Sequence, residues 1–147
     1  MKWLNQLVFA AMGCVVLASA TVGAAPTSKG RDVCVAAPTG GGGFNTFVFR
    51  DVAALSPGRA VALLGLYFTT GSQRVAPVHG SAIMASDGSV RLGFFVHTTA
   101  ESTNDFTVAG VTDANFAGTV SFDNDGDFKV NGTLDLAPVD CDTLTIP

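Results

Sequence analysis

The chain has few of the residues that usually mark an active site or a surface for polyanions. Of its 147 residues, 14% are charged, acidic residues outnumber basic ones by 12 to 8, and two are histidine. The basic residues form no cluster, so we expect no nucleic-acid partner. Neither a Gly-x-Ser-x-Gly elbow nor a zinc-ligand spacing occurs, so the familiar hydrolase and zinc-enzyme motifs are missing.

Tryptophan and tyrosine are also scarce, since Trp3 and Tyr67 are the only ones. The chain therefore lacks the aromatic stacking platforms that are typical of sugar-binding sites. No helical hydrophobic period of useful length occurs. After the first twenty residues, no apolar run is long enough for a transmembrane helix, and we expect the protein not to span a membrane.

The sequence does contain an export signal. Residues 1–20 have a basic start, an apolar centre and an Ala-Ser-Ala ending, as in a secretory signal peptide. We expect a flexible lead-in over residues 21–43, which include Cys34 and a glycine run, and one β-barrel domain over residues 44–147. The protein is then secreted, periplasmic or held at the cell surface.

Two cysteines, Cys34 and Cys141, remain after the expected cleavage. An even number of cysteines in an exported chain indicates a disulfide bond. The bond would close almost the whole domain into a ring, and the loop-entropy model gives such a ring on the order of 4 to 5 kcal/mol of stabilisation. Because no Cys-x-x-Cys spacing occurs, we expect a structural bond and no redox role.

Most of the remaining sequence alternates apolar and polar residues with the period of two that β-strands show. Turn signals rich in glycine, proline, asparagine and aspartate separate the runs. The expected strands cover residues 45–52, 59–69, 75–85, 88–98, 105–112, 116–122 and 127–136. Residues 34–37 or 141–146 supply an eighth. This meander predicts an all-β, single-domain, antiparallel up-and-down fold, a small barrel of seven or eight strands, with a two-sheet β-sandwich as the alternative.

Glycines within the strands indicate where the sheet bends. Three-residue loops at 113–115 and 124–126 would place Gly110, Gly118 and Gly132 side by side in neighbouring strands. Further mid-strand glycines are Gly65, Gly80 and Gly93. Such positions allow the sharp coiling that closes a small barrel, although each glycine could instead fit a local packing gap.

A two-residue loop at Asp87-Gly88 would point His79, the only candidate for acid–base chemistry, into the barrel lumen. It pairs His79 with Val96 and Ser81 with Phe94, so that all four face the lumen. There His79 could hold a ligand or act as an acid or base, whereas the alternative is a histidine satisfied in the core. The candidate ligand-binding residues are His79, Ser81, Phe94, Phe106 and Phe122, with Phe128 on the same face.

Both faces of the N-terminal strands are apolar, whereas the C-terminal strands alternate cleanly. An apolar second face indicates a partner surface, a homo-oligomer interface or a covering segment, and ordinary β-propensity is the alternative. The candidate interface residues on the outer face are Phe47, Phe49, Leu63 and Phe95.

One acidic run is the only hint of a cofactor. Asp123, Asp125 and Asp127 supply the oxygen ligands that calcium prefers. Phe128 follows where the EF-hand pattern has glycine, so the match is a weak one and a solvated acidic turn is the simpler explanation.

Together these observations favour a secreted, non-catalytic β-barrel that binds a small apolar ligand or a protein partner. The alternatives are a structural or assembly protein of the cell surface that acts as a homo-oligomer, and a barrel enzyme of isomerase or cyclase type that uses His79. The sequence does not identify the ligand or the partner.

Overall fold

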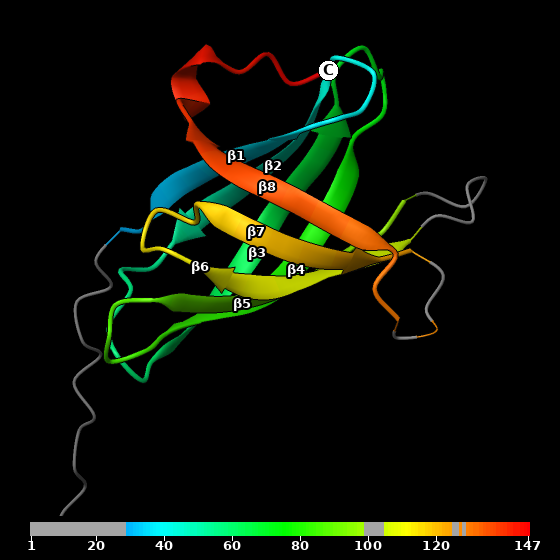
Figure 1. The fold of residues 1–147 in the computed structure, drawn as a ribbon. Coiled ribbons are helices and arrows are strands. Elements are labelled where there is room, and N and C mark those ends of the chain that lie inside the picture. Colours follow the sequence, from blue (N-terminus) through cyan, green and yellow to red (C-terminus); the bar gives the residue numbers. More distant parts are fainter. Residues whose placement is uncertain (1–28, 99–104, 125–126, 128) are drawn as a thin grey trace, which may run out of the picture.

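The computed structural model describes residues 29–98, 105–124, 127 and 129–147. Eight antiparallel strands close in chain order into an up-and-down barrel (Figure 1). They are β1 (Arg31–Pro38), β2 (Phe44–Val52), β3 (Ala60–Thr69), β4 (Ala76–Met84), β5 (Val90–Val96), β6 (Phe106–Thr112), β7 (Gly118–Asp123) and β8 (Gly132–Val139). A short 3-10 helix, η1 (Cys141–Thr143), follows β8. The barrel prediction is confirmed, and the closed sheet excludes the sandwich.

The eighth strand is β1, which lies within the segment expected to be a flexible lead-in, so the barrel takes up part of residues 21–43. Within the described ranges, we find no helix with the length and apolar character needed to cross a membrane.

A column of aromatic rings fills the middle of the barrel. The ring centroids of Phe47 and Phe94 are 5.0 Å apart, and those of Phe94 and Phe49 are 5.3 Å apart. Tyr67 continues the column at one end, 5.1 Å from Phe47, and Phe116 continues it at the other, 6.2 Å from Phe49. Because these rings pack against one another, side chains occupy the centre of the lumen.

The aromatic column overturns part of the expected oligomer interface. Phe47, Phe49 and Leu63 are fully buried in the barrel core, so their assignment to the outer face is wrong. The interior needs the largest side chains of β2 and β3 to fill it, and an apolar run on both faces of a strand does not reveal which face that is. Of the four residues, only Phe95 lies on the outer face, where it is half-buried.

The C-terminal segment, residues 140–147, covers part of the outer face of β1, β2 and β3. Cys34, Val48 and Phe68 form a second buried cluster, against which Leu144 and Ile146 pack. Figure 1 shows this segment running from η1 back across the barrel to the loops at the other end. A covering segment was one of the three explanations for apolar residues on both faces, and it holds for this part of the sheet.

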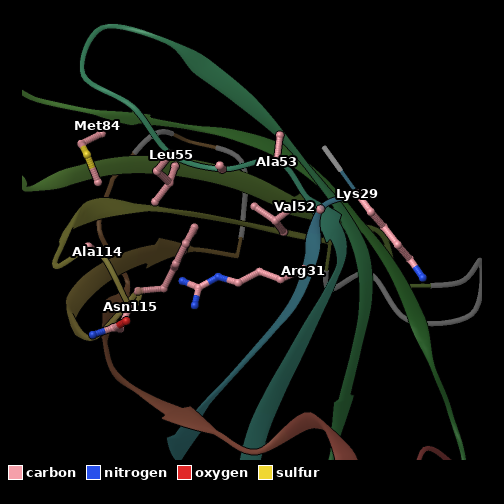
Figure 2. Close-up of a pocket in the computed structure, with 11 residues that line it drawn as sticks. Lys29, Arg31, Val52, Ala53, Leu55, Met84, Ala114 and Asn115 are labelled. Carbon is pink, nitrogen blue, oxygen red and sulfur yellow. The ribbon is translucent and has the colours of Figure 1, made fainter. Parts of the chain in front are cut away.

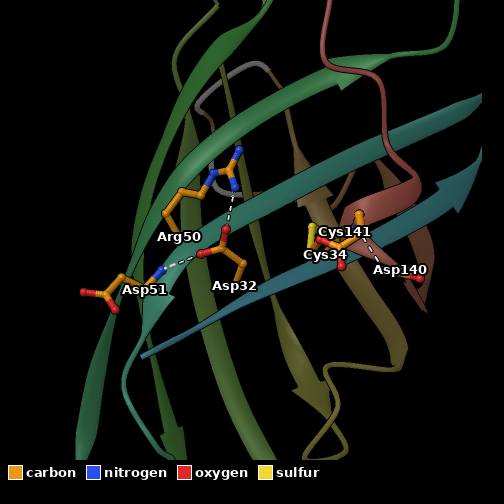
Figure 3. A network of polar contacts seen from close by, with 7 residues as sticks. Asp32, Cys34, Arg50, Asp51, Asp140 and Cys141 are labelled. Atoms are coloured by element: carbon orange, nitrogen blue, oxygen red, sulfur yellow. Dashed lines mark hydrogen bonds and ion pairs between the residues drawn. A yellow bond between two sulfur atoms is a disulfide. The ribbon is translucent and has the colours of Figure 1, made fainter. Parts of the chain in front are cut away.

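A disulfide joins Cys34 of β1 to Cys141 of η1 and closes the predicted ring, with a sequence separation of 107 (Figure 3). Beside it, the Asp32 carboxylate accepts hydrogen bonds from the Asp51 backbone N–H and the Arg50 guanidinium. These bonds hold the pKa of Asp32 below its usual value, the backbone bond most strongly. They lie where the β1–β2 pairing is irregular, between Arg31 and Val33 of β1. There Asp51 of β2 has a positive φ of 50°.

The predicted row of three glycines is wrong. Gly110 faces Val120, Gly118 faces Leu136 and Gly132 faces Phe122. The β6–β7 register differs by two residues because Phe116, with φ 66°, takes the left-handed turn position expected for Asn115. The β7–β8 register differs by four because the loop extends to Asn131, whose N–H donates to the carbonyl of Phe122. Both shifts are even, so the buried faces are kept.

Gly65 and Gly80 lie where the backbone of the neighbouring strand occupies the space that a side chain would need, as expected for glycines within strands. A Cβ atom on Gly65 would lie 1.9 Å from the Val48 carbonyl oxygen, and one on Gly80 would lie 2.2 Å from that of Gly93. Only glycine therefore allows the strands to approach this closely.

Candidate functional site

Two cavities open from the barrel interior, one at each end of the aromatic column. We call the first the Tyr67 mouth; it has a volume of about 270 Å³. It is lined by Asn45, Tyr67, Thr98, Phe106, Phe122, Asn124 and Leu134. We call the second, at the opposite end, the Arg31 mouth; it has a volume of about 390 Å³ (Figure 2). Its lining comes from residues 29–31, 52–55, 84 and 114–116.

Strand ends position the side chains of the Tyr67 mouth. Tyr67, near the end of β3, donates a hydrogen bond of 2.9 Å from its hydroxyl to Oδ1 of Asn45, near the start of β2. The Tyr67 ring stands edge-on to that of Phe106, with centroids 5.2 Å apart. Gly132 makes room for the neighbouring ring of Phe122, since a Cβ atom on Gly132 would lie 2.8 Å from that ring. The result is an aromatic floor with a polar edge.

The lining of the Tyr67 mouth carries no charged side chain among the described residues. Burial raises the pKa of the Tyr67 hydroxyl above its ordinary value, so this group stays neutral at physiological pH. The nearby Asp105 carboxylate is engaged, because it accepts hydrogen bonds from the Thr98 backbone N–H at 2.8 Å and contacts Nδ1 of His97 at 2.9 Å. The described lining of the mouth therefore presents neutral polar groups beside aromatic rings.

Three of the five predicted ligand-binding residues face the interior, and two of these reach a cavity. Phe106 and Phe122 line the Tyr67 mouth. Phe94 is 4% exposed and lies deeper, within the aromatic column, where it contacts the rings of Phe47 and Phe49.

His79 and Ser81 were predicted to face the lumen, and this is wrong. In the structure His79 pairs with Phe95 and Ser81 with Gly93, one residue away from the expected register, and both side chains are exposed. The loop has three residues and is closed by a hydrogen bond from the Ala85 N–H to the Ser89 carbonyl, and only its last residue, Gly88, has a positive φ. A two-residue turn of the Asp-Gly type needs positive φ at both positions.

The structure describes two of the three expected calcium ligands, Asp123 and Asp127. Asp125 lies outside the described residues, as does Phe128, and Asp127 forms an ion pair of 2.6 Å with Lys129. Asp123 ends β7, where it pairs with Thr107. Among the residues that the structure describes, no group of three or more potential metal ligands converges. The calcium site stays a prediction.

Sequence reasoning missed Asn45, Tyr67 and Leu134 as lining residues, and it missed the Arg31 mouth. Tyr67 carried a usable signal, because it is the only tyrosine of the chain and it falls at the end of an apolar strand. Arg31 carried none, since it stood in a segment read as a flexible lead-in.

The comparisons with known proteins give no relative: the chain matches no protein-family model, no curated protein and no solved structure.

Proposed function

We propose that the protein is an exported binding protein that holds a small, neutral, ring-containing molecule in the Tyr67 mouth. The observation that carries the proposal is a cavity of about 270 Å³ whose described lining carries no charged side chain and has an aromatic floor with amide groups at its edge. Ligand sites are mostly apolar cavities with a few placed polar groups, and their volumes start at about 300 Å³. The mouth lies just below this range, which favours a ligand of one or two rings.

The aromatic rings would bind the ring of a ligand, and the side-chain amide of Asn45 would bind its polar group. Tyr67 and Phe106 stand edge to face, an arrangement that aromatic pairs prefer, and a ligand ring can pack against them in the same way. The side-chain oxygen of Asn45 accepts the hydrogen bond from the Tyr67 hydroxyl, which leaves the two side-chain N–H groups of Asn45 to donate to a ligand. A neutral molecule with a ring and a carbonyl or hydroxyl group matches both. The predicted signal peptide and the disulfide support binding outside the cytoplasm.

The chain carries its own reporter for this test. After removal of residues 1–20, Tyr67 is its only strongly fluorescent residue, because the single tryptophan is Trp3. Titration with benzamide or benzyl alcohol should change the Tyr67 emission and its near-ultraviolet circular dichroism saturably. Sodium benzoate tests the charge preference and should bind more weakly, since no cation is among the described residues that line the mouth. If neither neutral compound alters the Tyr67 signals at millimolar concentration, the proposed ligand class is wrong.

Matched variants separate the mouth from the rest of the barrel. Asn45→Ala should weaken benzamide binding by about three- to ten-fold, because one hydrogen bond is lost. His79→Ala is the control, since His79 lies on the outer face against Phe95, with ring centroids 5.4 Å apart. Equal loss in both variants would place the binding elsewhere.

A second candidate function is self-assembly, which the outer face of β3–β5 favours. Leu64 is 58% exposed there, and it pairs with His79, which in turn pairs with Phe95. These three side chains form a row across three strands that contains no aspartate, glutamate, lysine or arginine. Sedimentation analysis of the wild type and of a Leu64→Lys, Phe95→Ser variant tests this function: a wild-type oligomer that the variant loses supports it, and a wild-type monomer at high concentration refutes it.

A further inference from the structure

The Arg31 mouth differs from the Tyr67 mouth in its chemistry. Val52 and Phe116 are buried beneath it, and Leu55 and Met84 are partly buried and pack against the core. These side chains form an apolar floor, to which methionine adds an adaptable surface. The volume of about 390 Å³ corresponds to on the order of a dozen water molecules, enough for a ligand with a short hydrocarbon body.

A single cation extends over this floor. Figure 2 shows the Arg31 side chain reaching across the cavity toward Ala114 and Asn115, whereas Lys29 points away from it. Arg31 forms no ion pair with any residue in the described part of the chain, unlike Arg50 and Lys129, which pair with aspartates. Its guanidinium keeps all five donors in a planar fork, which matches a carboxylate.

Two acids near this mouth, Asp32 and Asp113, are engaged by other groups. The Asp32 carboxylate is held by Arg50 and by the backbone N–H of Asp51. The Asp113 carboxylate accepts hydrogen bonds from the backbone N–H groups of Asn115 at 2.8 Å and Ala117 at 2.9 Å, within its own turn. No carboxylate is among the described residues that line the cavity. The chain is acidic overall, with net charge −4, so an unpaired arginine over an apolar floor is a local exception.

We propose that the Arg31 mouth binds a small amphipathic carboxylate, with its anionic group on the Arg31 guanidinium and its hydrocarbon body on Leu55 and Met84. The site is separate from the Tyr67 mouth, because the column of Phe47, Phe94 and Phe49 fills the barrel between them. The proposal does not rest on the function proposed for the other end.

Octanoate and octan-1-ol test the proposal, since they share a hydrocarbon chain and differ in charge. The purified, disulfide-bonded protein is titrated with each by calorimetry and by amide chemical shifts. We expect octanoate to bind with shifts centred on Leu55, Met84 and Asn115, and octan-1-ol and acetate to bind at least ten-fold more weakly. Binding of octanoate should also weaken as salt is added, because Arg31 is exposed.

Arg31→Gln should weaken octanoate binding about ten-fold or more, the loss expected for a hydrogen-bonded charge pair. Arg91→Gln is the matched control, because Arg91 is exposed on β5 and pairs there with outer-face Ile83. Equal affinity for octanoate and octan-1-ol would overturn the proposal without any variant. Failure of octanoate to bind, an Arg31→Gln variant with wild-type affinity, or shifts centred on Tyr67 and Phe106 would also overturn it.

Discussion

Adding one methyl group at Gly80 should destabilise the barrel severely, whereas the same change at Gly93 should not. Both glycines lie in mid-strand, in the adjacent strands β4 and β5. A Cβ atom on Gly80 would be 2.2 Å from the carbonyl oxygen of Gly93 and 2.5 Å from Cα of Phe94. A Cβ atom on Gly93 would meet nothing closer than 3.9 Å.

The magnitude follows from which atoms must move. Nonbonded carbon atoms are comfortable at about 3.5–4.0 Å, so Gly80→Ala overlaps the neighbouring backbone by more than an ångström. No side-chain rotation relieves a clash with backbone, and β4 and β5 must separate where they are hydrogen-bonded. Overpacking a core costs about 1–3 kcal/mol, occasionally more, and we expect about 3 kcal/mol or more here. Gly93→Ala should lie between neutral and about 1 kcal/mol stabilising, because alanine restricts the unfolded chain.

Urea unfolding of the two variants and the wild type measures this difference, with the denaturant slope as a check that the transition stays two-state. A Gly80→Ala protein that fails to fold where Gly93→Ala folds is the extreme form of the expected result. Variants whose free energies of unfolding agree within about 0.5 kcal/mol would refute the close approach of β4 and β5.

Three further predictions concern the packing of Phe116, the disulfide and the ionisation of Tyr67. Phe116 is fully buried with φ 66°, so Phe116→Ala should lower the free energy of unfolding by about 3–4 kcal/mol. Phe116→Gly should lower it by about 1 kcal/mol less, because glycine adopts this φ without strain. A lower urea midpoint for Phe116→Gly than for Phe116→Ala would contradict the left-handed turn at this position. Replacing Cys34 and Cys141 together by serine should lower the free energy of unfolding by about 4 kcal/mol, and a loss below about 1 kcal/mol would show that the C-terminal segment docks without the bond. Burial raises the pKa of Tyr67, so its contribution to stability is complete below the unfolded value of about 10 and is lost as the pH rises through the folded value; a tyrosinate absorbance midpoint at or below 10 would contradict this.

The sequence predicts the barrel well because each strand is marked twice, by alternation and by the turn residues at its ends. The largest boundary error is in the last strand, expected at 127–136 and found at Gly132–Val139. Val130 continues the alternation yet is 65% exposed, so it extends the pattern without a partner strand. At the other end the strand continues to Val139, and Pro138 pairs with Val35 of β1 beyond Leu136, the last residue of β8 that pairs with β7.

Site residues depend on register more sharply than strands do. The β6–β7 and β7–β8 errors were of two and four residues, so Phe106 and Phe122 still faced inward as predicted. The β4–β5 error was of one residue, which sent His79 and Ser81 to the outer face. The sequence Ser86-Asp87-Gly88 is compatible both with a three-residue loop that ends in glycine and with a two-residue Asp-Gly turn. The sequence alone does not distinguish the two loops.

Even a correct register leaves the depth of a side chain undetermined. Phe94, Phe106 and Phe122 all point inward, yet the first is core and the others line a cavity, because they lie at different heights along the barrel axis. Height depends on how far the strands are staggered as the sheet closes, a property of all eight pairings together. Since the aromatic column fills the centre, open sites remain at the strand ends, where Tyr67 and Arg31 lie near loops. These are the positions where sequence patterns fix the structure least, which explains why the barrel could be predicted and its two mouths could not.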